Sequence, residues 1–284
     1  MVKRKPFPLV KRFPFLQRLQ FSISKRHRFV ISVLLLSGGL FWSYTSVRNY
    51  NFWASFLLGI LADILFFISM YKDLKGNKNI QMFILPFMFT VAFGLIHYLT
   101  PSRFLSRFIL TTLYGVGIYS LFLSQNIFIV ASIRTIALLK GARIVSLIIA
   151  VISYLLLSDI IFSLHLPNII AVIGLFIPAI LIFVISFLLM LHATWEITLE
   201  KSIQKNVLWA FAIGVVLAEI SLPLWFWPTL PIVISIFLTG FFYTIVSLSQ
   251  VWNDRRLFRG VLWEYVWIPV IAFFILIWFT SWKG

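Results

Sequence analysis

Carboxylate side chains interrupt three long apolar stretches of this sequence, where an ionised group is costly. They are Asp63, Asp159 and Glu219, three of only eight acidic residues in the chain. A charge at the centre of a bilayer costs about 2.5–3.5 kcal/mol on insertion scales, so such groups face the interior of a helix bundle and find polar partners. Buried carboxylates can also bind and release protons, which makes these residues candidates for a proton- or cation-coupled site.

Basic side chains occur at a similar expected depth and could pair with these carboxylates. They stand at or beyond the outer ends of the apolar stretches, at His97, Arg103, Arg107 and His165. The sequence therefore predicts an intramembrane polar site drawn from Asp63, His97, Arg103, Arg107, Asp159 and Glu219. Ion pairs and interhelical hydrogen bonds that only fix the packing of the bundle are the alternative explanation. The order of the helices in the bundle does not follow from the sequence.

Membrane-spanning helices must position these groups. The chain of 284 residues is 61% hydrophobic and 11% charged, whereas a soluble domain has about 25% charged residues. Nine apolar runs are long enough to cross a hydrocarbon core of about 30 Å. They are residues 29–45, 52–71, 80–99, 108–130, 144–164, 169–193, 207–227, 229–250 and 266–282. Because they are continuously apolar and do not alternate as barrel strands do, we expect an all-α bundle of about nine spans.

The distribution of charge gives the orientation. A cytoplasmic N-terminus leaves only four of the 24 lysines and arginines outside, namely Arg48, Arg103, Arg107 and Lys283. Cytoplasmic loops carry an excess of Lys and Arg, so this alternation supports both the orientation and the number of spans. All 11 tryptophans fall at or near predicted span ends, where indole rings favour the headgroup level.

The fourth span has the least regular end. Gln125, Asn126 and Arg134 interrupt an apolar stretch that continues past residue 130. We expect a span over 108–130 and then a short interfacial helix over 131–143. A re-entrant segment or a second short span is the alternative, and it would invert every later span.

Several chemistries are excluded. The chain has no cysteine, which removes disulfides, Cys-ligated zinc and iron–sulfur clusters. His97 and His192 belong to opposite faces of the predicted membrane, so they cannot ligate one haem. The segment with Glu196 and Glu200 is interpreted as a solvated amphipathic loop. No zinc-protease, nucleophile-elbow or phosphate-binding motif is present, and we expect neither a metal nor a cofactor.

The N-terminal region differs from the rest of the chain. We divide the chain into a basic cytoplasmic tail with Phe and Pro, residues 1–28, and a transmembrane domain, residues 29–284. The net charge of +16 lies beside apolar spans, so the expected partners are the lipid bilayer and its anionic headgroups rather than nucleic acid. Each Lys or Arg near such a surface contributes about 1 kcal/mol. An arm that docks a protein partner is the alternative.

Three segments resemble an uncharacterised family of bacterial multi-pass membrane proteins that is described as a domain of unknown function. They are residues 126–143 (NIFIVASIRTIALLKGAR), 158–162 (SDIIF) and 226–229 (FWPT). The resemblance extends over most of the chain beyond about residue 108. It implies a bacterial cytoplasmic membrane and no particular activity.

These observations favour a membrane protein without enzymatic activity, either a small-solute or ion-coupled transporter or a component of a membrane complex. The first alternative is a membrane-embedded enzyme acting on lipid-linked substrates, with Asp159, His97 and Arg103 at the outer interface. The second alternative is a scaffold whose basic tail recruits a cytoplasmic partner.

Overall fold

The computed structural model gives the positions of most of the chain. It describes residues 24–46, 52–71, 80–96, 99–100, 103–131, 138–164, 173–198 and 203–281. Most of the basic tail, residues 1–23, lies outside the described residues, as does His97.

Within these ranges the chain forms nine α-helices and no strand. The helices are α2 (Lys25–Ser46), α3 (Phe52–Met70), α4 (Ile84–Leu95), α5 (Phe104–Ala131), α6 (Leu139–Ser163), α7 (Ile173–Thr198), α8 (Ile203–Leu224), α9 (Pro231–Asn253) and α10 (Arg259–Trp278). A short 3-10 helix, η3 (Ile80–Phe83), leads into α4. Eight of the α-helices are long and apolar enough to cross a membrane, and the stretch Ile80–Leu95 is shorter. The all-α architecture with about nine predicted spans is thereby confirmed.

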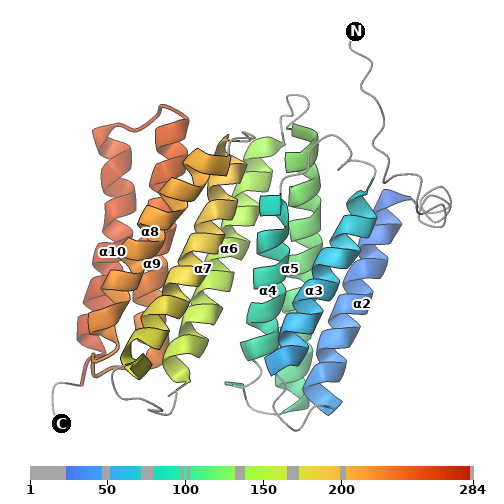
Figure 1. Ribbon diagram of the computed structural model, residues 1–284, viewed down its shortest axis with the longest axis horizontal. Helices are drawn as coiled ribbons and strands as arrows, with labels where there is room; N and C mark the ends of the chain where they lie inside the picture. Colours follow the sequence, from blue (N-terminus) through green and yellow to red (C-terminus); the bar gives the residue numbers. More distant parts are fainter. Residues whose placement is uncertain are drawn as a thin grey trace.

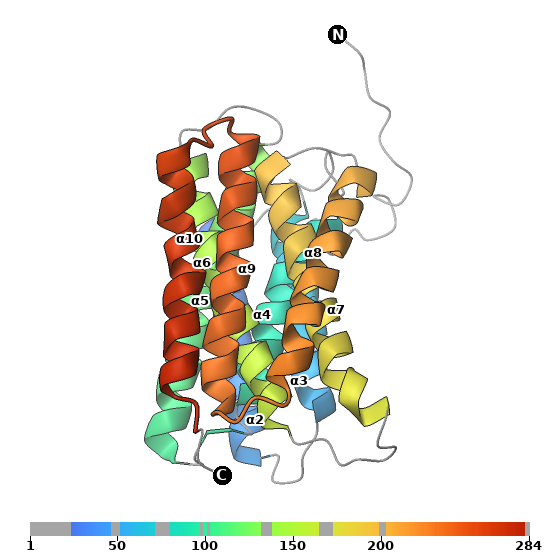
Figure 2. The ribbon, with the colours of Figure 1, turned by 90° about the vertical axis from the view of Figure 1, so that its left-hand side faces the viewer.

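The helices stand side by side along a common direction and form an elongated bundle (Figures 1 and 2). Helices α2, α3, α4 and α5 pack on one another, and α7, α8 and α9 do the same. Helix α6 joins these two groups because it contacts α4 and α5 on one side and α7 and α9 on the other. Helix α10 packs chiefly on α9, at the end of the row opposite α2.

The burial of side chains differs between the inner and the outer helices. Ten of the 12 residues of α4 are buried, since α3, α5, α6 and α7 surround it. The outer helices instead expose large apolar side chains such as Leu34, Phe108 and Phe274, as expected where lipid rather than water covers the surface. Backbone groups are satisfied inside each helix, which is the arrangement that a bilayer core requires.

The end of the fourth predicted span differs from the expectation. Helix α5 continues to Ala131, and α6 begins at Leu139. Lys140 and Arg143 therefore lie in the first turns of α6 and not on a separate interfacial helix. Residues 132–137, between the two helices, lie outside the described residues.

Close contact between α3 and α4 depends on glycine. A Cβ atom added at Gly94 would lie 2.7 Å from the Ser55 Cβ and Oγ atoms and 3.1 Å from the Ser55 Cα atom. We expect Gly94→Ala to lower the free energy of unfolding by about 1–3 kcal/mol, because the helices must move apart. Denaturation of the purified protein in detergent, followed by circular dichroism, measures this change.

Gly38 in α2 provides the matched control, because a Cβ atom there would meet nothing within 4 Å. Gly38→Ala should be neutral or stabilising by up to about 1 kcal/mol, since alanine is the better helix former. Adding Ser55→Gly to Gly94→Ala should restore part of the lost stability. Equal effects of the two alanine substitutions would contradict the packing explanation.

Candidate functional site

The predicted outer polar residues lie on several separate helices. Asp63 is in α3, Asp159 in α6 and Glu219 in α8, while Arg103 precedes α5 and Arg107 lies in its first turn. No side-chain hydrogen bond or ion pair joins any two of these five among the described residues. Asp63 and Asp159 are half-buried, and Glu219 is exposed. Helix α3 packs on α2 and α4, whereas α8 packs on α7 and α9, so Asp63 and Glu219 are on different parts of the bundle. Their joint role stays a prediction.

Two residues of this set, Asp63 and Arg107, each have a buried polar atom. Oδ1 of Asp63 and Nε of Arg107 are buried and have no hydrogen-bond partner among the described residues. Each group therefore offers an unused polar atom inside the bundle, on α3 and α5 respectively.

A different polar cluster forms at the end of the bundle that the charge distribution assigns to the cytoplasm. Its centre is Glu196, which stands one helical turn after His192 on α7. Both side chains are buried, with 6% of Glu196 and 1% of His192 exposed. The i and i+4 positions place them on the same face of the helix.

Three side chains converge on one carboxylate oxygen, Oε1 of Glu196. Gln125 from α5 donates to it from Nε2 at 2.8 Å, and Ser146 from α6 donates to it from Oγ. The third neighbour is Nε2 of His192, also at 2.8 Å. A buried carboxylate needs such donors, because desolvation penalises its charge strongly.

The contact of Nδ1, the other ring nitrogen, assigns the tautomer of His192. Nδ1 lies 2.7 Å from the backbone oxygen of Gln81 in η3, and a carbonyl oxygen can only accept, so Nδ1 carries a hydrogen. Nε2 of His192 lies 2.8 Å from Glu196 Oε1 and 3.2 Å from Gln125 Nε2. A proton held between His192 Nε2 and Glu196 Oε1 would join them as imidazolium with carboxylate or as neutral imidazole with carboxylic acid. We call these two residues the Glu196–His192 pair.

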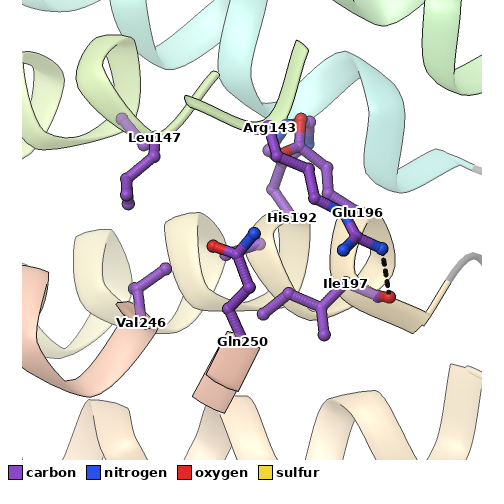
Figure 3. Close-up of a pocket in the computed structure, with 9 residues that line it drawn as sticks. Arg143, Leu147, His192, Glu196, Ile197, Val246 and Gln250 are labelled. Carbon is purple, nitrogen blue, oxygen red and sulfur yellow. Dashed lines mark hydrogen bonds and ion pairs between the residues drawn. The ribbon is translucent and has the colours of Figure 1, made fainter. Parts of the chain in front are cut away.

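A small cavity opens beside the pair, between α6, α7 and α9. It is lined by Arg143, Leu147, Ala150, His192, Ala193, Glu196, Ile197, Val246 and Gln250. In Figure 3, Leu147 and Val246 lie on one side, Arg143, Glu196 and Ile197 on the other, and Gln250 between them. The cavity offers about 20 Å³ to the centres of water-sized molecules, which is room for about one or two waters.

Arg143, which lines the cavity, links three helices. Its Nη2 donates to the backbone oxygen of Ile197 at the end of α7 (3.1 Å), and its Nη1 lies 3.4 Å from Oδ1 of Asp254 after α9. Nδ2 of Asn253 donates to the same Ile197 oxygen at 3.3 Å. A cation at a helix C-terminus satisfies free carbonyl groups and the helix dipole.

The sequence interpretation of Glu196 was wrong. It ended the sixth span at residue 193 and placed Glu196 in a solvated loop, whereas α7 continues to Thr198 and buries the side chain. The available signal was the spacing of His192 and Glu196 on one helical face. Polar residues inside other apolar runs, notably Gln125 and Ser146, were a second signal. Among the described residues, no three His, Asp or Glu side chains come together as metal ligands would.

Fold and site together define a multi-pass α-helical membrane protein with a buried acid–histidine pair near one end of its bundle. The chain belongs to the family described as "Protein of unknown function (DUF5656)", whose model matches residues 36–279. The resemblance noted in the sequence is thus confirmed, and the match extends to the early spans. Every residue of the Glu196–His192 site lies inside the matched region. No curated protein and no solved structure matches the chain.

Proposed function

We propose that the protein is a membrane transporter that couples movement of a small solute to proton binding at the Glu196–His192 pair. The observation that carries this proposal is the 2.8 Å contact between Glu196 Oε1 and His192 Nε2 in a buried site, where an acid and a base can share a proton. Ionisable groups inside membrane bundles are typical of proton relays in pumps and transporters.

The position of the pair supports coupling to a conformational change. Gln81 and Gln125 come from the group α2–α5, whereas Ser146 comes from α6 and the pair from α7. If the shared proton were lost, the lone pairs of Glu196 Oε1 and His192 Nε2 would repel each other. If a second proton bound, one of these two atoms could no longer accept a hydrogen bond. Either event changes the hydrogen bonds between the two helix groups. A proton that binds two arrangements differently shifts the equilibrium between them.

The outer polar residues extend the proposal to the other half of the membrane. Asp63, Asp159 and Glu219, with His97, Arg103 and Arg107 nearby in predicted depth, are candidates for the outer part of the path. The unused Oδ1 atom of Asp63 supports a role for this residue in particular. We further propose that the protein resides in a bacterial cytoplasmic membrane, with its basic tail on anionic lipid headgroups.

Proton flux into proteoliposomes tests the proposal. The full chain is reconstituted with potassium chloride on both sides, a pH step is applied, and an enclosed pH-sensitive dye reports proton entry. We expect flux through the wild-type protein and a fall in Glu196→Gln to the level of protein-free liposomes. Glutamine preserves the shape and an acceptor oxygen but cannot bind a proton at physiological pH.

Glu264→Gln is the matched control, because Glu264 is an exposed carboxylate at the start of α10. It should transport protons as the wild type does. Size-exclusion profiles of both variants in detergent establish that they are folded. The proposal fails if folded Glu196→Gln matches the wild type, or if the wild type gives no flux above empty liposomes.

A further inference from the structure

The Glu196–His192 pair has one side covered by protein and one side that meets the cavity. Gln81, Gln125 and Ser146 contact the pair from η3, α5 and α6. Gln125 and Ser146 are 0% exposed and Gln81 is 4% exposed, so these residues shield the pair from water on their side. Both members of the pair also line the cavity between α6, α7 and α9. The cavity is therefore the space through which a small molecule can reach the pair.

One carboxylate oxygen of Glu196 remains available to such a molecule. Oε1 is occupied by Gln125, Ser146 and His192, whereas Oε2 makes no hydrogen bond to a described residue. Oε2 also differs from the fully buried unpartnered atoms, such as Nε of Arg143, because it keeps accessible surface. A water molecule in the cavity can therefore donate a hydrogen bond to Oε2.

The side-chain amide of Gln250 is the second polar group that the cavity offers. It lies between the two walls of the cavity in Figure 3 and makes no side-chain hydrogen bond to a described residue. An amide can both donate to water and accept from it. A buried water needs sufficient room and about two to four polar partners. The cavity supplies the room, with about 20 Å³ for the centres of water-sized molecules, and Glu196 and Gln250 supply the partners.

The cavity leads toward the end of the bundle that the charge distribution assigns to the cytoplasm. Arg143, Ile197 and Gln250 line it within about one turn of the ends of α6, α7 and α9. The side chain of Arg143 is 13% exposed, so this end of the cavity reaches the surface. Ala150, further along α6, lines the cavity about 10 Å deeper.

Apolar packing closes the opposite direction. About one turn closer to the outer face, Leu189 follows the pair on α7 and Leu121 follows Gln125 on α5. Both leucines are 0% exposed, and neither lines the cavity. Protons move along chains of hydrogen-bonding groups, which these side chains do not provide. In this arrangement the pair is therefore accessible from the cytoplasmic end.

We infer that water in this cavity carries protons between the cytoplasm and the Glu196–His192 pair, with Oε2 of Glu196 and the amide of Gln250 as its partners. The inference rests on the proposed function and adds the side of the membrane from which the pair is loaded. A proton that arrives on the water passes to Glu196 and leaves the water neutral, and the reverse step returns it. Gln250 is a positioning residue, because it acts through the water. The charged groups beside this path, Arg143 and Asp254, have opposite signs and lie 3.4 Å apart, so they do not exclude a proton.

Hydroxyl-radical footprinting of the purified full chain tests for the water directly. An X-ray pulse converts bound water into radicals that oxidise adjacent side chains, and mass spectrometry locates the products. We expect oxidation of His192 although only 1% of it is exposed, because it lines the cavity. Met190 is the internal control, since it is 0% exposed, does not line the cavity and has an easily oxidised sulfur. It should stay unmodified. An unmodified His192, or equal oxidation of Met190, would overturn the inference.

Three variants test whether the water carries protons in the proteoliposome assay. Ala150→Val places two methyl groups in the cavity without altering any charge, and Gln250→Leu removes the amide at similar size. Each should lower proton flux by about tenfold or more, because a positioned donor or acceptor is lost from the path. Ala150→Val should also lower the oxidation of His192. Gln250→Glu keeps a polar partner for water and should retain flux, which a purely structural role of the amide does not predict.

Ala212→Val is the matched control, because Ala212 is an exposed alanine of α8. It should give the flux of the wild type. Normal flux in folded Ala150→Val and Gln250→Leu, with flux lost in Glu196→Gln, would overturn the water path and leave the transport proposal standing. Absence of flux through the wild type would overturn the transport proposal, and the footprint would still decide whether the cavity binds water.

Discussion

Glu196→Ala is expected to lower the free energy of unfolding by about 3–5 kcal/mol where the pair is imidazolium with carboxylate, the cost of removing one member of a buried charged pair. The substitution leaves Gln125, Ser146 and His192 without their common acceptor. A neutral interhelical hydrogen bond in a membrane protein is worth only about 0.6 kcal/mol on average. Most of the loss therefore comes from His192, which loses the partner for its shared proton. Unfolding in mixed micelles of increasing dodecyl sulfate content, followed by circular dichroism, measures the change.

Two variants show whether the loss arises from the pair. Glu264→Ala removes an exposed carboxylate and should change the free energy of unfolding by less than about 0.5 kcal/mol. Glu196→Gln keeps an acceptor oxygen for Gln125 and Ser146 and should cost less than the alanine variant. If Glu196→Ala is as stable as Glu264→Ala, the buried pair does not hold these helices together.

The spans were predictable because length and hydropathy alone determine which segments can cross a bilayer. Helices α6 and α9, for example, cover nearly all of the predicted apolar runs 144–164 and 229–250. Helix α4 illustrates the limit of this rule. Its run is apolar enough to count as a span, yet the helix is short and almost wholly buried. Hydropathy cannot distinguish a side that faces lipid from a side that faces other helices, because both are apolar.

The Glu196–His192 site was not predictable, since its members come together only when distant helices pack. Gln125 lies 71 residues from Glu196, and Gln81 lies 111 residues from His192. Sequence gives the depth of each residue in the membrane but not its lateral neighbours. The same limit applies to Asp63 and Glu219, which were grouped by depth and lie on helices in different parts of the bundle.

Trp195 shows how an interfacial pattern can conceal a core residue. Most tryptophans at the helix ends are exposed, among them Trp53, Trp252 and Trp278, as a headgroup belt requires. Trp195 was predicted to belong to this belt, but its side chain is fully buried at 0% exposure. Its ring lies 5.8 Å from the His192 ring and 6.2 Å from the Phe128 ring, between centroids.

We expect Trp195→Ala to lower the free energy of unfolding by about 3–5 kcal/mol, because the indole leaves a cavity that the surrounding helices cannot fill. The loss is mainly one of packing contacts, since lipid is as apolar as the core. The same dodecyl sulfate titration measures it. The Glu196–His192 pair should also be disturbed, because the His192 ring loses the indole that packs beside it.

Two comparisons complete this test. Trp267→Ala removes an indole that is 56% exposed and should have a small effect. Trp195→Phe keeps an aromatic ring and removes Nε1, which is buried without a partner among the described residues, so it should cost much less than alanine. If Trp195→Phe retained stability but reduced proton flux, Nε1 would be in use during transport, by water or by the moving proton. If Trp195→Ala were no more destabilising than Trp267→Ala, the residue would belong to the headgroup belt after all.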